Sequence, residues 1–317
     1  MEEQPYPILA SIIVRLLERT NMTGKIIKGV GGFYYVHLHD NFLYECKAKG
    51  IFRNRNIKPM VGDDVDIDII SEEDKTGNII SIHDRRNSLI RPAVSNVSQA
   101  IIIFALSNPK PNYNLLDRFL IMMGQRQIKT IICLNKSDLV DKEDADNIKD
   151  IYVKCGYEVI VTSTLDEKSQ KTGISELKAM LTGKTSVLAG PSGVGKSSIV
   201  NSICPDLYAK TGNISDKIKR GKHTTRHTEL MFLQDDTYIL DTPGFSSLYV
   251  EGIEPEDLRF YYNEFTGYEG KCRFNGCIHI NEPDCAVKEA LEQKKISTLR
   301  YDNYKQLYEE LKEKRKW

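Results

Sequence analysis

Short runs of apolar and aromatic residues, interrupted by polar turn residues, dominate the first part of the chain. Their alternation is typical of half-buried strands, and Gly, Asn and Asp between them favour turns. The runs are KIIKGV, FYYVHL, FLYECKAKG, VDIDII and GNIISIHD, within residues 25–84. Five strands in so short a stretch predict a small β-barrel. Our first interpretation is an OB-fold, and an SH3-like barrel is the alternative.

A different pattern begins at residue 99. Continuous apolar runs, among them QAIIIFAL, KTIICL, YEVIV, TSVLA and TYIL, predict buried strands. The segments NLLDRFLIMMGQR, EDADNIKDIYVKCG and GISELKAML between them have the apolar spacing of helices. Strands alternating with helices predict a parallel sheet covered by helices. Ligands bind such sheets at the carboxyl ends of the strands, so the loops that follow these runs are the candidate binding loops.

The final part of the chain, from about residue 255, is polar and is predicted to be rich in loops. Its last segment has apolar residues at helical spacing, which predicts a helix that packs on the rest of the protein. These residues are Ile296, Leu299, Tyr304, Leu307, Tyr308 and Leu311. The predicted division of the chain is an N-terminal extension at 1–21, a barrel at 22–92, an α/β domain at 93–254 and a C-terminal domain at 255–317.

Composition restricts the function classes. The 317 residues carry 44 Lys and Arg against 44 Asp and Glu, so the net charge of zero provides no global basic field for nucleic acid. No apolar run reaches the ~18 residues needed to cross a bilayer. The N-terminus begins acidic and Arg15 interrupts its apolar run, which is unlike a secretory signal. We therefore expect a cytoplasmic protein without a membrane partner.

The stretch GPSGVGKSS contains the phosphate-binding pattern G-x-x-x-x-G-K-[ST] in full. It follows an apolar strand and precedes a helical run, which is the context that this loop requires. The residues predicted to bind the nucleotide here are Gly190, Pro191, Ser192, Gly193, Val194, Gly195, Lys196, Ser197 and Ser198. Backbone N–H groups and the helix N-terminus would face the phosphates. Lys196 would reach the β- and γ-phosphates, and the Ser197 hydroxyl would ligate Mg²⁺.

The sequence NKSD ends another apolar run and predicts a guanine-reading loop formed by Asn135, Lys136, Ser137 and Asp138. The Asp138 carboxylate can accept hydrogen bonds from N1–H and the exocyclic amine of guanine. Adenine has an acceptor at N1, so a buried carboxylate facing it would stay unpaired at a cost of about 1–3 kcal/mol, which disfavours an ATP-dependent enzyme. Ser163, at the end of the next strand, is a weaker candidate for the same site. A helix cap by Ser137 or Asp138 is the alternative.

The order of the motifs is unusual. The sequence DTPG, which supplies Asp241 and Gly244 as candidates for supporting Mg²⁺ and sensing the γ-phosphate, follows the strand TYIL. The base-reading loop therefore precedes the phosphate loop, whereas the usual GTPase chain has the phosphate loop first. Joining DTPG back to the strand QAIIIFAL would restore the usual order. The sequence thus predicts a circularly permuted GTPase domain.

A Cys/His cluster lies beyond the α/β domain. The stretch CRFNGCIHINEPDC supplies Cys272, Cys277, His279 and Cys285. Three thiolates and one imidazole suit one structural, tetrahedral Zn²⁺ with a closed ligand shell, and unligated cysteines are the alternative. The chain has seven cysteines, an odd number, which favours reduced thiols and a metal site over a disulfide framework.

The β-barrel, the permuted motifs and the Cys/His tail together resemble the ribosome small-subunit-dependent GTPase A family, also called RsgA or YjeQ, from Met22 to nearly the end of the chain. The resemblance implies an OB-fold, a permuted GTPase domain and a small zinc-binding helical domain. It further implies a monomer that hydrolyses GTP to GDP and phosphate, is stimulated by the small ribosomal subunit and acts in late subunit maturation. The barrel's basic stretch KAKGIFRNRNIK is then a candidate contact for ribosomal RNA.

The candidate catalytic residues lie in the phosphate loop and in the loop before DTPG. Thr225, with Thr224 as second choice, would ligate Mg²⁺, and Lys196 would support catalysis. Phe245 occupies the position where many GTPases carry a Gln that orients the attacking water. A histidine in the loop before DTPG recurs in the family pattern, which makes His223 the candidate for that role. The alternative function is a GTP-dependent rRNA-binding scaffold whose hydrolysis is vestigial.

Overall fold

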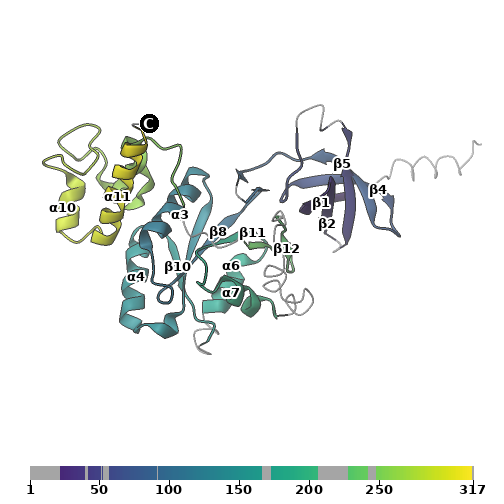
Figure 1. Cartoon of the computed structure of the whole chain (residues 1–317), viewed down its shortest axis with the longest axis horizontal. Helices are drawn as coiled ribbons and strands as arrows, with labels where there is room; N and C mark the ends of the chain where they lie inside the picture. Colours follow the sequence, from purple (N-terminus) through teal and green to yellow (C-terminus); the bar gives the residue numbers. More distant parts are fainter. Residues whose placement is uncertain are drawn as a thin grey trace, which may run out of the picture. The chain divides into compact units, whose positions relative to one another are not determined.

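The computed structural model describes residues 22–39, 42–50, 52, 57–90, 92–165, 173–205, 228–241 and 248–315 (Figure 1). The chain forms two compact units, Met1–Val97 with His223–Phe232 and Ser98–Lys222 with Leu233–Trp317. The predicted N-terminal extension lies outside the described residues. Within the described part of the chain, no helix is long and apolar enough to span a membrane.

The first unit contains a closed barrel of five strands in the order β1-β2-β3-β5-β4. The strands are β1 (Met22–Val30), β2 (Phe33–Leu38), β3 (Leu43–Ala48), β4 (Asp64–Ser71) and β5 (Thr76–Ile82). β3 and β5 pair in parallel, and β1 closes the barrel against β4 in the antiparallel sense. This topology confirms the predicted strands and the OB-fold, and it excludes the SH3-like alternative.

Polar contacts hold the segment after the barrel against it. The Asp63 side chain is fully buried and accepts hydrogen bonds from Arg85 Nε at 2.7 Å and from Ser95 Oγ at 2.6 Å. The segment also forms a small hairpin of β6 (Ser88–Leu89) and β7 (Val94–Ser95). Residues 228–232, which include β12 (Met231–Phe232), contact the same unit, because Leu230 N donates to Ile27 O at 2.8 Å.

The second unit is built on a parallel sheet in which five strands follow the order β10-β9-β8-β11-β13. They are β8 (Gln99–Ala105), β9 (Lys129–Asn135), β10 (Glu158–Val161), β11 (Thr185–Ala189) and β13 (Tyr238–Asp241). Every residue of β8 and β11 is buried, which explains their continuous apolar sequence. The predicted alternation of strands and helices is confirmed.

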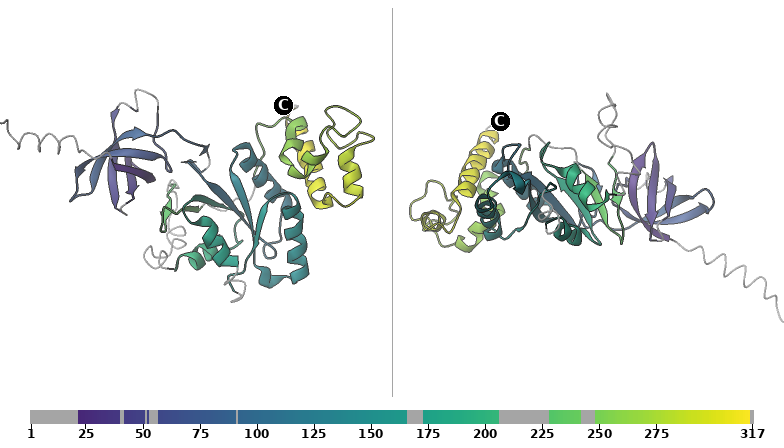
Figure 2. Two further views of the ribbon diagram at one scale, coloured as in Figure 1. Left: turned by 180° about the vertical axis from the view of Figure 1, so that it is seen from behind. Right: turned by 90° about the horizontal axis from the view of Figure 1, so that it is seen from below.

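Helices cover both faces of this sheet (Figures 1 and 2). α3 (Tyr113–Gln125) and α4 (Lys142–Lys154) lie on one face, and α6 (Ser175–Leu181) and α7 (Lys196–Ile203) lie on the other. Right-handed crossovers require this division, because the chain moves outward from β8 to β10 and then returns to β11.

The C-terminal part contains more regular structure than its polar sequence predicts. It comprises two 3₁₀ helices, η3 (Pro255–Tyr261) and η4 (Asn263–Tyr268), the short helix α10 (Ala286–Glu292) and the predicted terminal helix α11 (Thr298–Lys314). The apolar stripe of α11 is buried as predicted, except that Leu299 is half-buried. Stacked and edge-on rings of Tyr262, Phe265 and Tyr304 fill the core between these elements.

A buried ion network joins this C-terminal part to helix α3, which covers the parallel sheet. Arg300 of α11 is 1% exposed and donates to Asp117 of α3 and, at 2.8 Å, to Glu264 of η4. Asn303 also donates to Asp117, at 2.7 Å. The Arg300 guanidinium lies 4.5 Å from the centroid of the Tyr262 ring. A fully buried charge of this kind requires all of its partners, because solvent cannot replace them.

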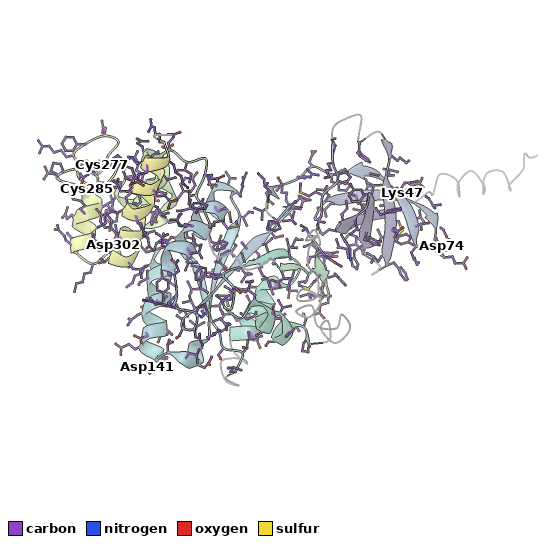
Figure 3. The ribbon with its side chains drawn as sticks, in the orientation of Figure 1. Lys47, Asp74, Asp141, Cys277, Cys285 and Asp302 are labelled. Carbon is purple, nitrogen blue, oxygen red and sulfur yellow. The ribbon has the colours of Figure 1, made fainter. Side chains whose placement is uncertain are left out.

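Asp117→Ala should therefore lower the free energy of unfolding by about 3 kcal/mol, the lower end of the range for a broken buried ion pair, because Glu264 still pairs with Arg300. Asp302→Ala is the control, since Asp302 is an exposed carboxylate on α11, the helix that carries Arg300, and pairs with exposed Lys305 (Figure 3). Its cost should stay below about 0.5 kcal/mol. Urea unfolding measures both values, and equal costs would contradict a structural role for the network.

Candidate nucleotide site and metal centre

The parallel sheet brings the predicted base-reading loop and phosphate loop to one edge. NKSD follows β9 and GPSGVGKS follows β11, and β8 lies between these two strands. Because the strands are parallel, their carboxyl ends meet at the same edge of the sheet. Asp241 ends β13 at that edge as well. The order of the motifs along the chain therefore does not separate them in space.

Two positions of the phosphate loop require glycine, because neighbouring atoms leave no room for a Cβ atom. A Cβ atom at Gly190 would lie 2.1 Å from the Ile103 carbonyl oxygen. One at Gly195 would lie 2.3 Å from Asn135 Nδ2, and Gly195 also has a φ of +96°. Any other residue at either position would force the loop away from β8 or from the base-reading loop.

Lys196 and Asp241 form the charged centre of the site. Lys196 Nζ donates to the carbonyl oxygens of Gly190 at 2.8 Å and Pro191 at 2.9 Å. Burial lowers the pKa of Lys196, while the nearby Asp241 carboxylate opposes that shift. Burial likewise raises the pKa of Asp241, and Lys196 opposes this. The Lys196 ammonium, held by carbonyl oxygens of its own loop, is a donor suited to a phosphate anion.

One oxygen of Asp241 fits the chemistry of a hard cation. Asp241 Oδ1 is buried and accepts no hydrogen bond from the described part of the chain. A carboxylate oxygen of this kind is the ligand that Mg²⁺ or its bound water prefers. Ser197 and Ser198 are exposed in the first turn of α7, so the Ser197 hydroxyl is accessible to the same ion.

Direct hydrogen bonds tie the base-reading loop to the phosphate loop. Asn135 Nδ2 donates to Val194 O at 2.8 Å. Lys136 has a left-handed backbone with φ of 61° and its Nζ donates to Gly193 O at 2.7 Å and to Asn108 O. The two motifs predicted from sequence therefore form one structural unit.

The Asn135 amide is oriented by a residue that the sequence reasoning missed. Thr162 is fully buried, and its hydroxyl donates to Asn135 Oδ1 at 3.0 Å, which leaves Asn135 Nδ2 facing the phosphate loop. Its neighbour Ser163, which was singled out, donates to the Asp138 carboxylate. The only signal for Thr162 was its place beside Ser163 at the end of an apolar run.

The helix-cap alternative for NKSD is wrong. The N-cap of α4 is Asp141, and neither Ser137 nor Asp138 occupies that position. Ser137 instead begins the single 3₁₀ turn η1 (Ser137–Leu139), which places the Asp138 side chain against Ser163. Asp138 is exposed, as a residue that contacts a base must be before the base binds.

The predicted switch residues lie outside the described residues. These are His223, Thr224, Thr225, Gly244 and Phe245. Their predicted roles in Mg²⁺ binding, γ-phosphate sensing and water activation stay predictions.

The four predicted metal ligands come together in the C-terminal part, where Figure 3 labels Cys277 and Cys285 side by side. Their ligand atoms all lie within 4.8 Å of one another. The Sγ atoms of Cys272 and Cys285 are 3.9 Å apart, and His279 Nδ1 lies 3.5 and 3.4 Å from them. Tetrahedral Zn²⁺ with its usual bond lengths requires about 3.8 Å between sulfurs and about 3.6 Å between sulfur and nitrogen. The cluster therefore fits one zinc ion.

A second layer of contacts orients these ligands. His279 Nε2 lies 3.1 Å from the Glu269 carboxylate, so a neutral His279 would present Nδ1 to a metal. Glu282 accepts backbone N–H groups of the loop, from Ile278 at 2.7 Å and Ile280 at 3.0 Å, and these bonds help to lower its pKa against the effect of burial. Sequence reasoning missed both carboxylates, whose only signal was their proximity to the cysteines.

Aromatic rings and lysines gather on the barrel, where RNA contact was predicted. The Lys75 ammonium lies 3.8 Å from the Phe42 ring centroid and 5.2 Å from that of Tyr44. Lys47 lies 5.0 Å from the Phe33 ring centroid. The Tyr44 ring is buried, whereas Phe42 is exposed and Phe33 is half-buried, and cations beside accessible rings are typical of surfaces that bind single-stranded nucleic acid. Much of the basic stretch at 47–58 lies outside the described residues.

Fold and site together define a nucleotide-binding protein of the phosphate-loop class whose motifs are circularly permuted. Two family models match the chain, one described as the RsgA N-terminal domain over residues 23–79 and one described as RsgA GTPase over residues 82–251. A protein of Agathobacter rectalis named small ribosomal subunit biogenesis GTPase RsgA is 55% identical over 306 residues, covering 93% of this chain and 100% of that protein.

Solved structures agree with these matches. YjeQ from Thermotoga maritima is 34% identical with a TM-score of 0.77, covering 92% of this chain and 98% of that one. YloQ, described as a circularly permuted GTPase, is 37% identical with a TM-score of 0.75, covering 94% and 97%. The chain belongs to the RsgA family of GTPases, as its sequence pattern predicted.

Asp138→Asn should weaken GTP binding at least tenfold, because the amide would set an N–H₂ group against the donors of guanine. Xanthosine triphosphate carries an oxygen in place of the amine, so its affinity should rise in the same variant. Ser163 can still donate to the amide oxygen, so the loop should keep its fold. Nucleotide titration measures both affinities, and a GTP affinity within twofold of wild type would show that Asp138 does not read the base.

Elemental analysis of protein purified without added metal should find one zinc per chain. Cys277→Ser should lose the metal and increase hydrogen exchange across η3, η4 and α10, because structural zinc contributes folding free energy. Cys204→Ser, which removes a thiol outside the cluster, should keep the zinc. A metal-free C-terminal part with wild-type protection would contradict the zinc assignment.

Proposed function

We propose that the protein hydrolyses GTP to GDP and phosphate on the small ribosomal subunit, which stimulates it, during late maturation of that subunit. The observation that carries the GTPase proposal is the pair of hydrogen bonds from Asn135 and Lys136 to the phosphate loop. These bonds join a base-reading element to a phosphate-binding element in one site. The name of the Agathobacter rectalis relative supports the choice of the small subunit.

Each end of the nucleotide has its own set of residues in this proposal. Asp138, oriented by Ser163, reads the guanine, and Lys196 with the N-terminus of α7 holds the β- and γ-phosphates. Ser197 and Thr225 would hold Mg²⁺, with Asp241 supporting it. When bound, Mg²⁺ neutralises charge that develops on the β- and γ-phosphate oxygens.

Orientation of the attacking water falls to His223 in this proposal. Phe245 carries no hydrogen-bonding group, so it cannot fill the role of the usual Gln. Intrinsic hydrolysis is therefore slow, and the subunit accelerates it by bringing His223 toward the attacking water and Thr225 onto Mg²⁺.

Ribosomal RNA is the partner that we assign to the barrel. The lysines that lie over aromatic rings on the barrel support this assignment, because they combine charge for phosphates with flat surfaces for bases. Because of the permutation, the chain runs from DTPG directly into the C-terminal part. A change at DTPG between the GTP-bound and GDP-bound states therefore moves the zinc-binding domain. The protein acts as a monomer in the cytoplasm, where the subunits mature.

Small subunits should raise GTP turnover by a factor below the roughly 10³–10⁵ that a supplied catalytic group can reach in related systems, since placing a histidine that the chain already carries gives less. Large subunits should have no such effect, and the stimulation should fall with salt because RNA contacts release counterions. His223→Ala should keep GTP and subunit binding and lose most of the stimulation.

Two results would count against this proposal. Stimulation of His223→Ala equal to that of wild type would move the water-orienting group to the ribosome. Binding to subunits that depends on GTP, without any stimulated turnover, would favour the scaffold function instead.

A further inference from the structure

The segment that follows the DTPG motif lies between two helices. Leu248 O accepts a hydrogen bond from Arg118 Nη1 at 3.2 Å, and Glu251 O accepts one from Gln125 Nε2 at 2.9 Å. Both donors belong to α3. Val250, between the two carbonyls, is 4% exposed and packs in the same core as Ile121. Residues 248–251, which we call the exit segment, are therefore fixed to α3 by both backbone and side-chain contacts.

Arg118 also binds the terminal helix α11. Its guanidinium forms a two-point ion pair with Glu310 of α11, with Nη1 to Oε1 at 3.1 Å and Nη2 to Oε2 at 2.5 Å. Its Nε donates to Asn114 Oδ1 at 2.7 Å, one turn earlier on α3. The side chain is only 11% exposed, so these bonds are poorly screened by solvent. The planar fork is thus held in one orientation by three neighbours.

Contacts from the last turn of α11 return to the exit segment. Lys314 pairs with Glu310 at 3.0 Å, and its ammonium lies 4.4 Å from the centroid of the Tyr249 ring. Hydrogen bonds from Arg118 and Lys314 lower the pKa of Glu310 against the opposing effect of burial. Glu310 therefore stays ionised at neutral pH, and the link remains charged on both sides.

The other end of α11 holds the loop of the metal ligands. Tyr301 OH donates to His279 O at 2.7 Å, and Tyr304 OH donates to Ile278 O at 2.5 Å. A displacement of α11 along its axis would therefore change the position of the backbone that carries His279. One rigid helix connects Arg118 to the candidate zinc site.

We propose that Arg118 is a positioning residue that couples the exit segment of the DTPG motif to α11, so that the nucleotide state controls the placement of the zinc-binding loop. This inference rests on the proposed GTPase function and deepens it by naming the residue that links the two parts. Arg118 suits this role because the same guanidinium contacts the exit-segment carbonyl and the α11 carboxylate. A shift of Leu248 cannot leave both bonds intact unless α11 moves with it.

A charge-swapped pair of residues distinguishes a link between the exit segment and α11 from mere packing of α3 against α11. Arg118→Glu combined with Glu310→Arg can rebuild an ion pair between α3 and α11, but a carboxylate cannot donate to Leu248 O. Arg118→Gln removes the ion pair and weakens the Leu248 bond. Gln306→Ala is the matched control, because Gln306 also joins α11 to α3, through Asn114 at 3.1 Å, without contacting the exit segment.

Hydrogen exchange of α11 and the zinc loop should be compared in the full-length, zinc-loaded protein with GDP and with a non-hydrolysable GTP analogue. Wild type and Gln306→Ala should show a difference between the two nucleotides. Arg118→Gln and the swapped pair should lose at least half of that difference, while nucleotide affinity stays within twofold and zinc content stays unchanged.

Several outcomes would overturn the proposal. The first is equal hydrogen exchange with both nucleotides in wild type, and the second is an undiminished difference between the nucleotides in Arg118→Gln. The third is a wild-type difference in the swapped pair, which would show that Arg118 only packs α3 against α11. If Arg118→Gln does not fold, the difference in hydrogen exchange between the two nucleotides in the swapped pair tests the proposal by itself. Because no subunits are present, this test can fail while subunit-stimulated hydrolysis stands, and the reverse also holds.

Discussion

The nucleotide site depends on one constraint, which is that parallel strands end at a common edge. β9, β8, β11 and β13 are neighbours in the sheet whatever the order in which the chain visits them. Asn135 can therefore hydrogen bond to Val194 although its motif comes first in the sequence. Circular permutation leaves these contacts unchanged and alters only what is attached to the ends. Here it attaches a barrel before β8 and the C-terminal part with the Cys/His cluster after β13.

The sequence predicts the features that depend on a local pattern, namely the glycines of the phosphate loop, the Cys/His cluster and the strands. Gly190 and Gly195 stand where the backbone leaves no room for a Cβ atom, and the glycine pattern of the phosphate loop indicates both positions. Cys272 and His279 belong to a Cys/His cluster whose members lie close together in the sequence as well as in space. The barrel strands followed from alternation, and the buried strands from continuous apolar runs. Each of these signals lies within a few residues of the position it predicts.

What the sequence did not disclose depends on partners that are distant along the chain or on weak local patterns. Thr162 orients Asn135 across two strands, and nothing in its own neighbours marks it. The two 3₁₀ helices η3 and η4 are too short for apolar periodicity, although Phe265 of η4 is fully buried. Arg300 looks like an ordinary polar residue of an exposed helix face, yet it is the largest fully buried side chain of the described residues.

The ion pair between Arg300 and Asp117 has a consequence for the order in which the protein is made. The two residues are 183 positions apart, and Arg300 belongs to α11, the last helix among the described residues. Synthesis proceeds from the N-terminus, so the face of α3 that carries Asp117 emerges long before its cation exists. Until then that carboxylate must remain hydrated, and α3 cannot complete its packing. A chain truncated or stalled before α11 would therefore lack the finished packing of α3 as well as the helix that carries Arg300.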